Sequence, residues 1–84
     1  MTSRLGTDLG TGVKPTALDL YTLYYKVKAM QDALRAEARE YGEWGAVRSL
    51  DSATYYLFGA AGWLVQDLTP EERAELETQL EALA

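Results

Sequence analysis

Hydrophobic side chains recur every three or four residues along three stretches of the chain, the spacing of one face of an α-helix. The first stretch begins at Thr16, which can cap a helix together with Asp19, three residues later. Gly42 and Gly45 follow the stretch and favour a helix end. The helix predicted from these signals spans Thr16–Tyr41. Its apolar stripe contains Leu20, Leu23, Val27, Met30, Leu34, Ala38 and Tyr41.

A second helix is predicted from about Ser49–Ser52 to Leu68, after a connection over Tyr41–Arg48. Its side chains are apolar on nearly every face, as in a helix at the centre of a small domain. Gly59 and Gly62 interrupt it, although glycine costs roughly 1 kcal/mol relative to alanine inside a helix. We therefore expect a packing reason for both glycines, namely a small-residue surface that another backbone can approach closely.

The clearest local signal is Thr69-Pro70-Glu71-Glu72, which places threonine at a helix cap, proline at the first helical position and glutamate at the third. Leucines then repeat at helical spacing at Leu76, Leu80 and Leu83. No pair of strands with a hairpin turn is visible. We predict an all-α fold, a small three-helix domain over residues 15–84. Its first helix is long, its second apolar and central, and its third acidic and amphipathic.

Residues 1–14 contain Gly6, Gly10 and Gly12, a glycine density that opposes both helix and regular strand. We expect an N-terminal arm that is flexible or becomes ordered only within an assembly.

The amino-acid composition excludes most kinds of catalytic site. The chain has no histidine and no cysteine, so the commonest general base, the commonest transition-metal ligand and the thiolate nucleophile are all missing. The phosphate-loop pattern fails because Val13 and Pro15 separate residues that it needs in sequence. Carboxylate clusters such as Glu71, Glu72 and Glu75 are typical of a solvated helix face. We predict that the protein is not an enzyme and has no catalytic residue, metal site, cofactor or small-molecule substrate.

The net charge of −5 is concentrated at one end of the chain. Residues 1–66 balance seven acidic against seven basic side chains, whereas residues 67–84 hold six acids and one base, Arg73. Binding of nucleic acid needs a basic patch, and none is visible. Met1–Pro15 lacks the apolar core of a signal peptide, and no stretch is long and apolar enough to span a membrane. We expect a cytoplasmic protein, or a virion protein if it belongs to an assembly.

Six tyrosines and two tryptophans are the most informative remaining feature. Tyr24-Tyr25 and Tyr55-Tyr56 are adjacent pairs, and neighbours on a helix point about 100° apart, so both members cannot easily enter one core stripe. Tyrosine and tryptophan are enriched at protein interfaces. The predicted interface residues are Tyr21, Tyr25, Trp44, Tyr55, Gly59, Gly62 and Trp63.

These features favour a non-enzymatic interaction module that self-associates as a homo-oligomer or docks a protein partner through apolar and aromatic helix faces. Two alternatives stay open. One is a structural subunit of a larger assembly, such as a phage virion, whose arm is ordered on a neighbouring subunit. The other is an acidic inhibitor that presents residues 67–84 to a basic or nucleic-acid-binding protein. The lack of isoleucine and asparagine suggests a GC-rich genome, that of a bacterium or its phage.

Overall fold

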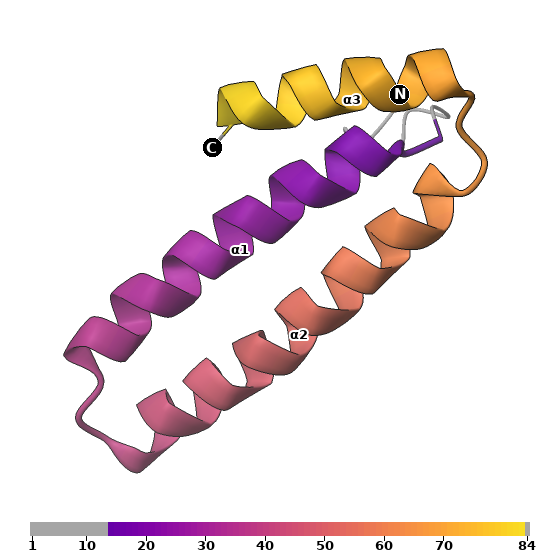
Figure 1. Cartoon of the computed structure of the whole chain (residues 1–84). Helices are drawn as coiled ribbons and strands as arrows, with labels where there is room; N and C mark the ends of the chain where they lie inside the picture. Colours follow the sequence, from indigo (N-terminus) through magenta and orange to yellow (C-terminus); the bar gives the residue numbers. More distant parts are fainter. Residues whose placement is uncertain (1–13, 84) are drawn as a thin grey trace, which may run out of the picture.

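The computed structural model describes residues 14–83 of the chain, which form three helices and no strand. The helices are α1 (Ala17–Glu37), α2 (Tyr41–Val65) and α3 (Pro70–Leu83). Helices α1 and α2 run antiparallel as a hairpin, and α3 crosses the end where α1 begins and α2 ends (Figure 1). The predicted all-α fold is confirmed. The predicted arm, residues 1–14, lies outside the described residues except for Lys14.

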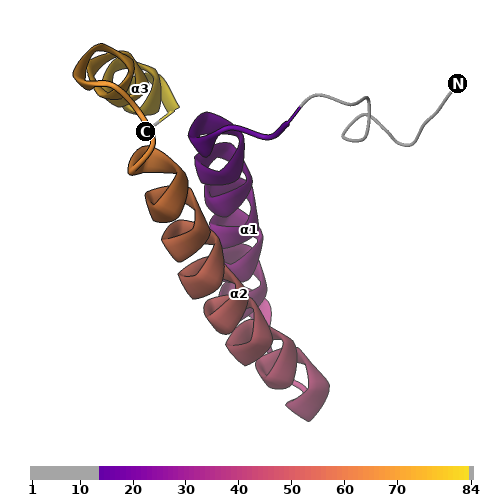
Figure 2. The same cartoon turned by 90° about the vertical axis from the view of Figure 1, so that its right-hand side faces the viewer.

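Helix α1, and not the more apolar α2, is the helix that packs against both of the others. Figure 2 shows α3 to one side of the pair, against the beginning of α1. The radius of gyration, 15.4 Å, exceeds the roughly 12 Å typical of a compact chain of this length. The fold is therefore an extended hairpin with a third helix at one end, rather than a closed bundle.

Two of the predicted helix starts are confirmed by their capping hydrogen bonds. At the start of α1, Asp19 N donates to Thr16 Oγ1 (3.2 Å) and Thr16 N donates to Asp19 Oδ2 (2.8 Å). At the start of α3, Glu72 N donates to Thr69 Oγ1 (3.1 Å) and Thr69 N donates to Glu72 Oε1 (2.9 Å). Each box satisfies two backbone donors that have no partner within the helix.

Replacing Thr69 with alanine should lower the free energy of unfolding by about 1 kcal/mol, because the cap of α3 loses its side-chain acceptor. Urea unfolding followed by far-ultraviolet circular dichroism measures the loss. Thr78→Ala is the matched control, since Thr78 is exposed in the middle of α3 and alanine is the better helix former there. Equal losses in both variants would contradict the capping role of Thr69.

The connection between α1 and α2 was predicted in the wrong place. Helix α1 ends at Glu37 rather than Tyr41, and α2 begins at Tyr41 rather than near residues 49–52. The backbone turns at the buried Ala38, which is extended (φ −65°, ψ 133°). Glu43 Oε1 then accepts hydrogen bonds from Arg39 N (2.7 Å) and Glu40 N (2.9 Å). This carboxylate accepts from the two backbone N–H groups just before α2 and so anchors the start of the helix. The two glycines predicted as helix ends lie inside α2.

The two backbone hydrogen bonds hold the pKa of Glu43 below 4.5, its ordinary value. A lowered folded-state pKa contributes stability that is present above the unfolded value and is lost as pH falls through the folded one. We therefore expect the wild type to lose stability below pH 4.5. At neutral pH, Glu43→Gln should have a lower free energy of unfolding than the wild type. On going from neutral pH to a pH below 4.5, it should lose less of that free energy than the wild type does. Urea unfolding at the two pH values measures both differences. Glu77→Gln, an exposed substitution on α3, should change neither quantity.

Small side chains fill most of the interior of the described residues. The buried apolar residues are Ala17, Ala38, Val47, Ala61 and Leu76. Gln31 and Thr54 are the buried polar residues, and Gln31 is the largest side chain that is fully buried. Helices that meet through alanine approach closely but remove little apolar area from water. Most of the large hydrophobic side chains therefore remain outside this interior.

The apolar stripe predicted for the first helix is only partly covered. Leu23 is 45% and Met30 is 58% exposed, and the side chain that α1 buries against α2 is Gln31. Its Nε2 donates to the Val47 carbonyl (3.3 Å) and to Asp51 Oδ1 (3.2 Å), whereas its Oε1 has no partner. The contact face of α1 is thus rotated away from the aliphatic stripe.

Candidate interaction surface

A broad, open groove of about 800 Å³ lies over α2 and reaches α1 on one side of the hairpin. It is lined by Tyr24, Lys28, Asp51, Thr54, Tyr55, Tyr56, Phe58, Gly59, Ala60 and Trp63. Lys28 and Asp51 are its only charged residues, and five of the ten carry aromatic rings. The groove therefore offers mainly ring surface, with polar groups where α1 meets α2.

Aromatic rings from both helices meet on the α1 side of the groove. Phe58 of α2 contacts Tyr21 and Tyr24 of α1 edge to face, with ring centroids 5.6 and 5.4 Å apart. Tyr24 also meets its neighbour Tyr25 at 5.3 Å. Such pairs contribute roughly 0.5–1.5 kcal/mol beyond the area that they bury. This cluster joins α1 to α2 and fixes where the groove begins.

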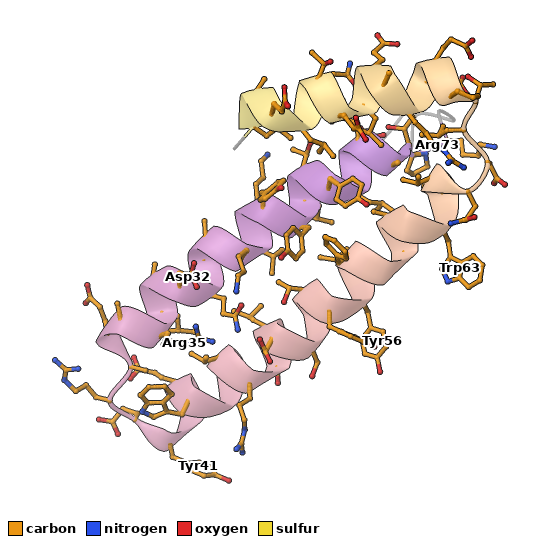
Figure 3. All side chains as sticks on the ribbon, in the orientation of Figure 1. Asp32, Arg35, Tyr41, Tyr56, Trp63 and Arg73 are labelled. Atoms are coloured by element: carbon orange, nitrogen blue, oxygen red, sulfur yellow. The ribbon has the colours of Figure 1, made fainter. Side chains whose placement is uncertain are left out.

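Three large aromatic side chains of α2 are exposed. Tyr55 is 74%, Tyr56 71% and Trp63 77% exposed. Figure 3 shows Tyr56 and Trp63 projecting from α2 on the side away from α1. Tyr55 and Tyr56 contact each other edge to face (5.3 Å), and nothing in the described residues covers them.

The glycines of α2 leave a gap beside these rings. A Cβ added at Gly59 or Gly62 would meet no atom within 4 Å. Both glycines line a second hollow of about 240 Å³, together with Trp63 and Gln66. The expected packing reason for the glycines is therefore not found within residues 14–83. We call Tyr55, Tyr56, Gly59, Gly62 and Trp63 the aromatic face.

The structure brings together four of the seven predicted interface residues, and these are Tyr55, Gly59, Gly62 and Trp63. Tyr21 lies at the edge of the groove, because its ring packs on Phe58. Tyr25 contacts Tyr24 without lining the groove. Trp44 lies in the first turn of α2, about 28 Å along the helix from Trp63. Trp44 is therefore not part of the aromatic face.

Sequence reasoning missed seven groove residues, and these are Tyr24, Lys28, Asp51, Thr54, Tyr56, Phe58 and Ala60. The spacing of residues along α2 indicates part of this set. Positions 55, 58, 59, 62 and 63 follow the i, i+3, i+4, i+7, i+8 pattern of one helical face, so Phe58 belongs with the predicted interface residues. The contributions from α1 depend on how the two helices pack, which the spacing within one helix does not reveal.

The acidic side chains of α3 lie apart from the groove. They are all exposed, and the one ion pair found within residues 14–83 joins Asp32 to Arg35 on α1 (3.7 Å). In the same residues, no three acidic side chains gather as metal ligands do. No helix of the described part is both long enough and apolar enough to cross a bilayer.

Comparison with known proteins gives no relative: no family model, curated protein or solved structure matches the chain.

Proposed function

We propose that this protein is a non-catalytic interaction module whose aromatic face docks another protein surface, either a second copy or a different partner. The observation that carries the proposal is the exposure of Tyr55, Tyr56 and Trp63 beside two glycines that nothing in the described residues approaches. Monomeric proteins rarely expose large contiguous apolar patches unless those patches bind something.

Burial of the three rings alone does not give tight binding, so the proposal includes close approach of a partner helix. Three rings of about 200 Å² each, three-quarters exposed, offer roughly 450 Å² and thus on the order of 10 kcal/mol on burial. Association itself costs about 4–15 kcal/mol. Since these two terms nearly balance, tight binding needs further contacts. Gly59 and Gly62 supply them by letting the backbone of a partner helix approach α2 closely.

Photo-crosslinking tests the proposal directly. Benzoylphenylalanine in place of Tyr56 should give a discrete crosslinked protein in cells of the native host, and mass spectrometry then shows whether it is the chain itself. The same probe at Ala33, an exposed residue of α1, is the control. The crosslink should be lost when Gly62→Leu closes the gap on the aromatic face. Equal labelling from both positions would refute docking through this face.

Gly59→Ala and Gly62→Ala should each raise the free energy of unfolding by about 1 kcal/mol, because alanine is the better helix former and the space is empty. Both should weaken docking, because a Cβ occupies the gap. Gly42→Ala and Gly45→Ala are matched controls in the same helix with the same open space. Both should stabilise the fold, Gly42→Ala by less because Gly42 lies in the first turn of α2, and both should leave the Tyr56 crosslink intact. Unchanged crosslinking in all four variants would show that the glycines do not serve docking.

A further inference from the structure

Burial repeats every seven residues on both helices. On α1 the repeating positions, of which only Tyr24 is not buried, are Ala17, Tyr24, Gln31 and the cap Ala38. On α2 the positions are all buried and are Val47, Thr54 and Ala61. A seven-residue repeat is the pattern by which helices pack side by side in coiled coils and helical bundles.

A second repeat, three positions after the first, is aliphatic on both helices. On α1 it consists of Leu20, Val27 and Leu34. On α2 it consists of Leu50, Leu57 and Leu64. All six are only half-buried, and beside them on α1 are the exposed Leu23 and Met30. We call these eight residues the leucine face.

The leucine face and the groove lie on opposite flanks of the hairpin. On a helix, a residue three positions on is turned about 60° to one side, and a residue four positions on about 40° to the other. The groove residues Lys28 and Asp51 lie four positions after Tyr24 and Val47, whereas Val27 and Leu50 lie three positions after them. A partner on the leucine face therefore leaves the aromatic face free.

We propose that a second copy of this chain covers the leucine face, so that two α1–α2 hairpins form a four-helix bundle. In such bundles both repeats of each helix face the core. In this hairpin the first repeat is buried except at Tyr24, whereas the second stays partly exposed at the flank. Half-burial of six aliphatic residues in two matching repeats is what one half of a bundle shows.

Charge and area both favour a second copy as the occupant. The leucine face has no charged residue, although the chain carries a net charge of −5, so two copies can meet there without bringing like charges together. The 21 residues of α1 span about 31 Å, and two adjacent helices are about 20 Å wide. The footprint of the face is thus on the order of 600 Å² per copy, the lower end of the roughly 600–1,000 Å² per partner of standard stable interfaces.

Size-exclusion chromatography with light scattering tests this dimer. At micromolar concentration the wild type should have twice the 9.3 kDa mass of one chain. Leu57→Lys should have the mass of one chain, because a charge enters the centre of the interface. Met30→Lys should do the same, and since Met30 is 58% exposed in the hairpin, this change leaves the monomer fold intact. Leu83→Lys, an equal charge change at an exposed leucine of α3, should remain a dimer.

Three outcomes would overturn the inference: a wild type of single-chain mass, dimers that persist in both lysine variants, or a Leu83→Lys protein that is also monomeric. This inference goes beyond the proposed function, because it concerns a different surface. This inference and the proposed function can fail independently of each other. If Trp63→Ala abolishes the dimer and Met30→Lys does not, the second copy binds the aromatic face, so this inference fails and the proposed function stands. If Met30→Lys abolishes the dimer while the Tyr56 crosslink is absent, this inference stands and the proposed function fails.

Discussion

Ala61→Leu should lower the free energy of unfolding by about 1–3 kcal/mol and make the chain markedly less helical at physiological temperature. Ala61 has no exposed surface and belongs to the alanine-rich contact between α1 and α2. Three extra carbon atoms at this position must push the helices apart or force a strained rotamer. For a small domain with a modest core, a loss of this size is a large share of the total stability.

The matched control for this substitution is its neighbour, Ala60→Leu. Ala60 is exposed on the same helix, and leucine has nearly the same helix propensity as alanine. Urea unfolding of both variants, followed by circular dichroism, should therefore separate the effect of packing from that of the residue itself. If Ala60→Leu lost as much stability as Ala61→Leu, close helix contact at Ala61 would not be what stabilises the hairpin.

Gln31→Met should raise the free energy of unfolding by about 1–2 kcal/mol. The Oε1 atom of Gln31 is buried without a hydrogen-bond partner, and an unpaired buried acceptor costs about 1–3 kcal/mol. Methionine has similar length and volume and no such acceptor. The two acceptors that lose the hydrogen bonds from Gln31 Nε2 are little affected, because the Val47 carbonyl lies within α2 and Asp51 is exposed to water.

Gln79→Met, an exposed change on α3, is the control for residue type and should leave the unfolding midpoint nearly unchanged. A loss of stability in Gln31→Met would mean that the two hydrogen bonds from Nε2 outweigh the unpaired oxygen. That result would make Gln31 a stabilising residue of the hairpin, contrary to the expectation here.

The sequence predicted the fold class and two helix starts because those features depend on neighbouring residues. Thr16 with Asp19, and Thr69 with Glu72, each place donor and acceptor three residues apart, so the bonds form wherever the helix forms. The beginning of α2 follows the same chemistry, since Glu43 reaches back to Glu40. The sequence does not reveal this start, because Gly42 and Gly45 favour a helix end by propensity, whereas both lie within a helix that packing stabilises.

The candidate surface was predictable only where it depends on one helix. Tyr55, Gly59, Gly62 and Trp63 share a face by spacing alone. Tyr24 and Lys28 join them through the packing of α1 on α2, and that packing buries Gln31 rather than the more apolar Met30. A rule that places the most apolar stripe inside therefore predicts a contact face of α1 that is displaced toward the exposed Leu23 and Met30. The reason is that close helix contact here depends on small side chains on α2, which a hydropathy pattern does not weigh.

The short connection held by Glu43 also bears on how fast the chain folds. Residues 38–40 join two helices that lie against each other from the turn outward, so contacts near the turn link residues close together in sequence. Helical proteins with such local contacts fold in microseconds to milliseconds. Joining two chains is a bimolecular step whose rate depends on concentration. A nascent chain would therefore complete its hairpin well before it meets a second one. In the dimer proposed above, assembly would then proceed between preformed halves.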